Sequence, residues 1–165
     1  MGEIGFNGRS GETGYILHKY GNASNVSEHE VYTNCITKIH LGSGITSIGA
    51  CAFQNCYSLI SITIPDEVTS INNSAFQNCF SLATIIIPGR ITNIDIYTFN
   101  GCYSLALIII SDEVTHIYNY AFYNCFSLAS IIISDGIASI GNSAFYNCFS
   151  LASITISDGV TNIGN

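Results

Sequence analysis

The chain has 165 residues, of which 48% are hydrophobic and only 9% are charged, and its formal net charge is −7. Charged side chains usually supply about a quarter of a globular domain, so Ser, Thr and Asn must cover much of this surface. Because Arg90 is the only Lys or Arg after residue 38, the sequence lacks the clustered cations that bind nucleic acids or anionic membrane surfaces.

The N-terminal segment 1–34 lacks the periodicity of the rest of the chain, and we expect a non-repeat N-terminal cap or linker there. Residues 14–18 (Gly-Tyr-Ile-Leu-His) fit a capping strand. The segment has neither the basic start nor the apolar run of a signal peptide, so a cytoplasmic protein is expected if Met1 is the natural start. No apolar run reaches the roughly 18 residues of a membrane span, so membrane insertion is not expected.

From residue 35 to residue 165 the chain repeats itself with a 23-residue period, which predicts a solenoid of stacked repeats. One partial copy comes first, and five copies follow, the last of them truncated. Six columns of identical residues keep their phase through the five copies. They are a Phe column (Phe53, Phe76, Phe99, Phe122, Phe145), a Cys column (Cys56, Cys79, Cys102, Cys125, Cys148), a Leu column (Leu59, Leu82, Leu105, Leu128, Leu151) and three Ile columns (Ile62, Ile85, Ile108, Ile131, Ile154; Ile64, Ile87, Ile110, Ile133, Ile156; Ile71, Ile94, Ile117, Ile140, Ile163).

Each copy predicts a strand, a turn and a second apolar segment. The alternation of Ile62 and Ile64 predicts a short strand. Pro65 and Asp66 end it, because proline has no amide hydrogen and Asp favours turns. Residues 75–79 (Ala-Phe-Gln-Asn-Cys) are predicted to form one helical or 3₁₀ turn that carries the Phe into the core. One copy cannot enclose its own apolar residues, so the copies must stack, with their strands in a parallel sheet.

The pattern C-x-x-L-x-x-I-x-I-P-x-x-V-x-x-I-x-x-x-A-F, from Cys56 to Phe76, resembles the treponemal-type leucine-rich repeat of BspA-like proteins. The resemblance covers residues 35–165, with Ser in place of Pro at positions 111, 134 and 157. It implies an α/β fold: a right-handed leucine-rich-repeat solenoid with a parallel sheet on the concave face and short helical or 3₁₀ turns and irregular segments on the convex face. It also implies a protein-binding or adhesion scaffold, secreted or at the cell surface, whose ligand is a host or matrix surface protein.

The Cys column predicts buried free thiols rather than disulfides. Equivalent residues of stacked strands lie about 4.8 Å apart and point the same way, whereas the Cβ atoms of a disulfide lie about 3.5–4.5 Å apart. A buried thiol behaves as a small apolar side chain. Cys35 and Cys51 lie outside the column, and one or both are candidates for reactive thiols.

Metal and catalytic sites are not expected. Zinc needs closely spaced Cys and His, and the one local candidate group is His29, Cys35 and His40. Four acids follow the predicted strands in one column, where they are interpreted as turn residues or, alternatively, as calcium ligands. They are Asp66, Asp112, Asp135 and Asp158. No nucleophile elbow, catalytic triad or phosphate-binding loop is present, so we predict no enzyme and no cofactor.

The outward positions of the predicted sheet hold the candidate ligand-binding site. Where Leu59, Ile62 and Ile64 point inward, the residues between them face the solvent on the concave side. In the middle copies these outward residues form an apolar patch, which often marks an interaction site. It comprises Ile86, Leu107, Ile109 and Ile132. The alternative is that β-branched residues are there because they suit a sheet.

An aromatic column and the C-terminal end of the repeats each allow two interpretations. A column of aromatic residues either stiffens the solenoid by stacking or binds sugars. Its members are Tyr57, Phe80, Tyr103, Phe126 and Phe149. The sequence stops just before the next Ala-Phe is due, which fits either a fragment of a longer array or end-to-end self-association. The alternative to a surface binding module is therefore an intracellular or self-associating interaction scaffold.

Overall fold

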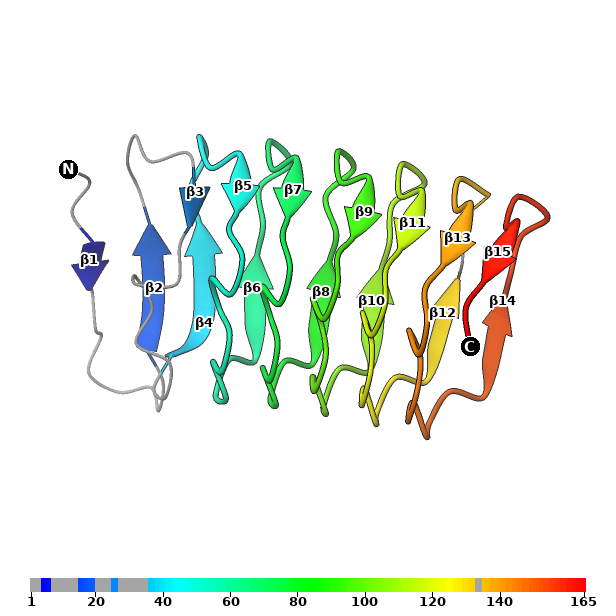
Figure 1. Cartoon of the computed structure of the whole chain (residues 1–165). Helices are drawn as coiled ribbons and strands as arrows, with labels where there is room; N and C mark the ends of the chain where they lie inside the picture. Colours follow the sequence, from blue (N-terminus) through cyan, green and yellow to red (C-terminus); the bar gives the residue numbers. More distant parts are fainter. Residues whose placement is uncertain (1–3, 7–14, 20–24, 27–35, 133–134) are drawn as a thin grey trace.

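In the computed structural model the chain winds into a β-solenoid whose coils stack side by side (Figure 1). The structure describes residues 4–6, 15–19, 25–26, 36–132 and 135–165; for the first three segments and for Ile132 it describes the backbone alone. Each coil contributes one longer and one shorter strand, because the two apolar segments of every repeat run along opposite sides of the same core.

The longer strands line one side of the solenoid. They are β2 (Tyr15–Lys19), β4 (Ile36–Leu41), β6 (Ser61–Thr63), β8 (Thr84–Ile86), β10 (Leu107–Ile109), β12 (Ser130–Ile132) and β14 (Ser153–Thr155), with β1 (Ile4–Phe6) antiparallel at the edge of β2. Strands β1, β2, β4, β6, β8 and β10 form one six-stranded sheet, in which β4, β6, β8 and β10 pair in parallel at equivalent positions, as Ile86 does with Ile109. Strand β12 pairs with β14 in a separate two-stranded sheet. Between β10 and β12 the Ala129 amide donates to the Ala106 carbonyl at 3.5 Å.

The shorter strands stack along the opposite side of the core. They are β3 (Asn25–Val26), β5 (Ser47–Ile48), β7 (Ser70–Ile71), β9 (Asn93–Ile94), β11 (His116–Ile117), β13 (Ser139–Ile140) and β15 (Asn162–Ile163). They pair in parallel in two groups, β3-β5-β7 and β9-β11-β13-β15, as Ile117 does with Ile140. The strand expected at residues 14–18 is present as β2, which pairs in parallel with β4; its role as a cap stays a prediction.

The remaining side of each coil is a tight turn and not a helix. Two residues per turn have a positive φ, for example Ser74 (57°) and Asn78 (60°). Such left-handed residues do not continue a right-handed helix. Between them, one amide bonds within the turn and the next bonds to the neighbouring coil: Gln77 donates to Ser74, whereas Phe76 donates to Thr98 at 2.9 Å. The predicted helical or 3₁₀ turns are thus absent from the described residues, and the α/β class is corrected to an all-β solenoid there.

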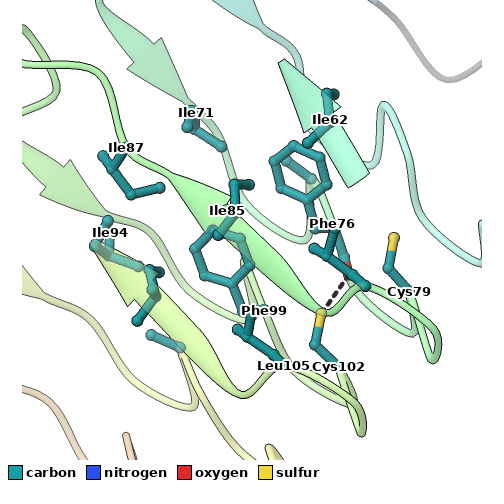
Figure 2. Packing of buried hydrophobic residues seen from close by; sticks show 14 of the residues in the cluster. Ile62, Ile71, Phe76, Cys79, Ile85, Ile87, Ile94, Phe99, Cys102 and Leu105 are labelled. Atoms are coloured by element: carbon teal, nitrogen blue, oxygen red, sulfur yellow. Dashed lines mark hydrogen bonds between the residues drawn. The ribbon is translucent and has the colours of Figure 1, made fainter. Parts of the chain in front are cut away.

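The repeated apolar columns form one continuous core (Figure 2). The rings of the Phe column are stacked in parallel, with centroids 5.3–5.5 Å apart, and the first four are fully buried. Burying a side chain of this size contributes about 1.5–3 kcal/mol, so every coil is stabilised mainly by its two neighbours. The last coil has a neighbour on one side only, and Ile163 is 58% exposed where Ile117 is buried.

Candidate functional site

Of the predicted ligand-binding residues, Ile86, Leu107 and Ile109 lie on the solvent side of the longer strands, which we call the strand face. Strand periodicity sends alternate side chains to opposite sides, so Ile85 and Ile108 enter the core while their neighbours face outward. Ile86 is 65% exposed, Leu107 47% and Ile109 51%. We call these three residues the strand-face patch.

The register of β8 and β10 brings the three side chains of the patch together. Ile109 pairs with Ile86, and Leu107 pairs with Thr84. Neighbouring strands lie about 4.7–4.9 Å apart, so outward side chains at paired positions form a continuous apolar surface across the two strands. Ile132 belongs to β12 and pairs with Thr155, but its side chain lies outside the described part of the structure. The inclusion of Ile132 in the site therefore stays a prediction.

The surroundings of the patch are polar or small. Thr63 and Ser130 are exposed on the strand face beside it, and the exposed Ala106 lies where β10 begins. After the longer strands come the acidic loops, where Asp112 and Glu113 are also exposed. The patch itself contains no titratable side chain, so it can bind by excluding water but offers no acid, base or nucleophile.

The cysteines of the column are free, as predicted, and all but the half-buried Cys148 are buried. Cys102 is fully buried. Each thiol from the second copy onward donates a hydrogen bond to the main-chain carbonyl of the preceding coil's Phe, as Cys102 does to Phe76 at 3.2 Å (Figure 2). Burial raises the pKa of the Cys102 thiol, and raises the pKa of Cys148 to about 11. These thiols support packing and are poor nucleophiles.

The two cysteines outside the column have different outcomes. Cys51 is half-buried and free, at a turn position with φ of 58°. Cys35 lies outside the described residues, as does His29 from the local zinc candidate, while His40 is exposed on the strand face. In the part of the chain that is described, no three His, Cys, Asp or Glu side chains are grouped closely enough to hold a metal ion.

The aromatic column forms a ladder of stacked rings along the turns. Successive centroids from Tyr57 to Phe149 are 4.5–5.4 Å apart, with interplanar angles of at most 23°. Because each ring covers the face of the next, the faces that a sugar would need are occupied within the ladder. This geometry favours the stiffening role over sugar binding.

Two tyrosine pairs and two asparagine pairs also stack along the turns, and of these the sequence indicates only Tyr123 and Tyr146, as neighbours of the aromatic column. Tyr97 stacks on Tyr120 at 4.9 Å, and Tyr123 stacks on Tyr146 at 5.1 Å. Along the left-handed turn position, Asn78 donates to Asn55 at 2.9 Å and Asn147 donates to Asn124 at 2.8 Å. The recurrence of these residues at the repeat period was the available signal.

These features together define a repeat scaffold with an exposed apolar patch on its strand face. The chain matches the model of the BspA type Leucine rich repeat region (6 copies) over residues 24–148 and 97–165, and it belongs to this family. No curated protein shows significant sequence similarity to it. The described segments contain no helix with the length and apolar character needed to cross a bilayer.

Solved bacterial structures share the fold. A leucine-rich repeat protein of T. pallidum is 25% identical with a TM-score of 0.74, over 98% of this chain and 83% of that one. A leucine-rich repeat protein of Bacteroides ovatus is 28% identical (TM-score 0.69; 97% and 41% of the two chains). A leucine rich cell surface protein of Faecalibacterium prausnitzii is 26% identical (TM-score 0.61; 87% and 50%). The chain thus spans half or less of two of these relatives.

Proposed function

We propose that this chain is a protein-binding scaffold whose ligand contacts the strand-face patch. The exposure of Ile86, Leu107 and Ile109 on two paired strands carries the proposal. The equivalent outward positions in the first and last copies are polar, such as Thr63 and Thr155. A sheet does not require isoleucine at an outward position, so the local concentration of apolar side chains favours a binding role over strand propensity alone.

The cellular setting is part of the same proposal. We propose adhesion at the cell surface, with a host or matrix protein as the ligand. The F. prausnitzii relative, described as a cell surface protein, supports this setting. Locating an epitope-tagged copy of the native gene product in fractionated cells tests it, and a product confined to the cytoplasm would contradict it.

The binding test compares Ile86→Ser/Ile109→Ser with the native chain. Peptides from a displayed random library and a panel of purified matrix proteins serve as probes. Tyr146→Ser is the matched control, because Tyr146 is 55% exposed but lies on a turn. We expect the double variant to lose at least about tenfold in affinity for patch-dependent ligands, while its unfolding free energy changes by no more than about 1 kcal/mol. Equal binding by both variants and the native chain would end the proposal.

A second candidate function is a self-associating scaffold. The exposed apolar side chains of the strand-face patch support it, because an exposed apolar surface also promotes association with a second copy of the chain. Light scattering across a concentration series tests this candidate, and a monomer at all concentrations would rule it out for this chain.

A further inference from the structure

The acidic residues of the solenoid gather along one border of the strand face. Seven acidic residues follow residue 30 in the sequence, and six of them occupy the loops that lead from the longer strands to the shorter ones, at the upper edge of Figure 1. All six side chains are exposed. We call this group the acidic border; it consists of Asp66, Glu67, Asp112, Glu113, Asp135 and Asp158.

Apart from Asp95, the acidic side chains are confined to one side of the described coils. The described turns on the other side are also exposed, at Tyr97 and Tyr118 for example, and in those turns Asp95 is the one acid and is half-buried. Amide side chains in these turns donate and accept hydrogen bonds between coils, as Asn78 does to Asn55. An ionised carboxylate can only accept, so it cannot replace them there, and the negative charge is left beside the strand face.

The border lies within electrostatic reach of the patch. Asp112 is the third residue after Ile109, so their Cα atoms are at most about 11 Å apart. That distance is comparable to the Debye length of about 10 Å at about 0.1 M salt and exceeds the length of about 8 Å at physiological ionic strength, so the effect of the border on a ligand is strongest at low salt. On the opposite side, where β10 begins, the exposed Ala106 carries no charge. The strand face is therefore apolar in the middle and negative along one edge, with Arg90 as the single cation in that border.

We infer that the partner of the strand-face patch is a cationic segment of a protein: its apolar side chains cover Leu107 and Ile109, and its Lys or Arg side chains face the acidic border. The inference rests on the proposed function, because it names the chemistry of that site's ligand. Charge complementarity across an interface accelerates encounter and rejects partners of the same sign. The net charge of −7 repels acidic partners at longer range in the same way.

The test selects ligands without assuming a sequence. A displayed random-peptide library is selected on the native chain in about 50 mM salt, where exposed charges are weakly screened. Peptides whose binding is lost with Ile86→Ser/Ile109→Ser are kept. We expect these peptides to be enriched in Lys and Arg. Their binding to Asp112→Asn/Glu113→Gln should be weaker by about 3- to 10-fold, the effect of two rim charges.

Two matched single variants separate the effect of a carboxylate's position from the effect of the chain's net charge. Asp112→Asn and Asp95→Asn each remove one carboxylate, and Asn72 already occupies the position equivalent to Asp95 in the previous coil. Only Asp112→Asn is expected to weaken the selected peptides, and raising the salt concentration should remove the difference. Selection of neutral or acidic patch-dependent peptides whose affinity is unchanged by the border variants would overturn this inference and leave the proposed function standing. A selection without any patch-dependent peptide would overturn both.

Discussion

The asparagine pairs in the turns are interrupted at Gly101, and Gly101→Asn should restore a continuous ladder. Gly101 occupies the same left-handed position as Asn78 and Asn124, with φ of 74° against 60° and 62°. Asparagine tolerates this conformation better than other residues with a side chain. A new asparagine can donate to Asn78 below it and accept from Asn124 above it, in the geometry of the existing pairs, whose bonds are 2.8–2.9 Å long.

The size of the effect follows from these bonds and from the contact that a side chain would meet. A Cβ atom at Gly101 would lie 2.6 Å from Oδ1 of Asn78, which is the end of a flexible side chain and can rotate. Two hydrogen bonds contribute about 0.5–1.5 kcal/mol each, and loss of glycine's freedom in the unfolded chain adds up to about 1 kcal/mol. After the cost of the rotated Asn78, we expect a net stabilisation of about 1–2 kcal/mol.

The matched control is Gly101→Ala. It introduces the same Cβ and the same contact with Asn78, but no hydrogen bond, and alanine is disfavoured at positive φ by about 1–2 kcal/mol. Gly101→Ala should therefore destabilise the fold while Gly101→Asn stabilises it. Urea unfolding and calorimetry measure both, with a shift in Tm of about 2–4 °C per kcal/mol for a chain of this size. The ladder argument would be refuted if Gly101→Asn were no more stable than the native chain. It would also be refuted if Gly101→Ala were as stable as the native chain.

Three further predictions concern packing, ionisation and the turns. Ile117→Ala should cost about 2–5 kcal/mol because Ile117 is buried between two coils, whereas Ile163→Ala should cost less than about 1 kcal/mol; equal losses in urea unfolding would contradict nearest-neighbour stacking. Burial raises the pKa of Cys148 to about 11 from an ordinary 9.0, so the unfolded chain releases this proton first and stability should fall as pH rises from about 9 to 11. Cys148→Ala should lessen that fall. If the stability of this variant depended on pH as that of the native chain does, the raised pKa of Cys148 would not be the cause. Ser111 has a buried hydroxyl without a hydrogen-bond partner at the position that is proline in the two preceding copies, so Ser111→Pro should raise stability by about 1 kcal/mol, and a lower Tm would show that proline does not fit there.

The pattern of burial and exposure could be predicted from the sequence because the hydrophobic columns fix the register of the stack. A slip of one residue between strands would expose Ile85 and bury Ile86, so only one alignment buries the whole column. The same reasoning predicted the buried thiols of the Cys column and the outward direction of Leu107 and Ile109. These conclusions need only the repeat period and the alternation within a strand.

The turns were decided by tertiary contacts. Taken alone, the five residues Ala-Phe-Gln-Asn-Cys predict a helical turn. Nothing in them shows that the Phe76 amide donates a hydrogen bond to the Thr98 carbonyl. That partner belongs to the next coil, and bonds to it replace the local bonds that a helix would make. The stacking of the aromatic rings and the separation of the acidic border from the turns also depend on which side of each coil a segment occupies. The repeat thus determined by itself that the coils stack and which residues fill the core, whereas the path of the turns was decided only when neighbouring coils supplied their hydrogen-bond partners.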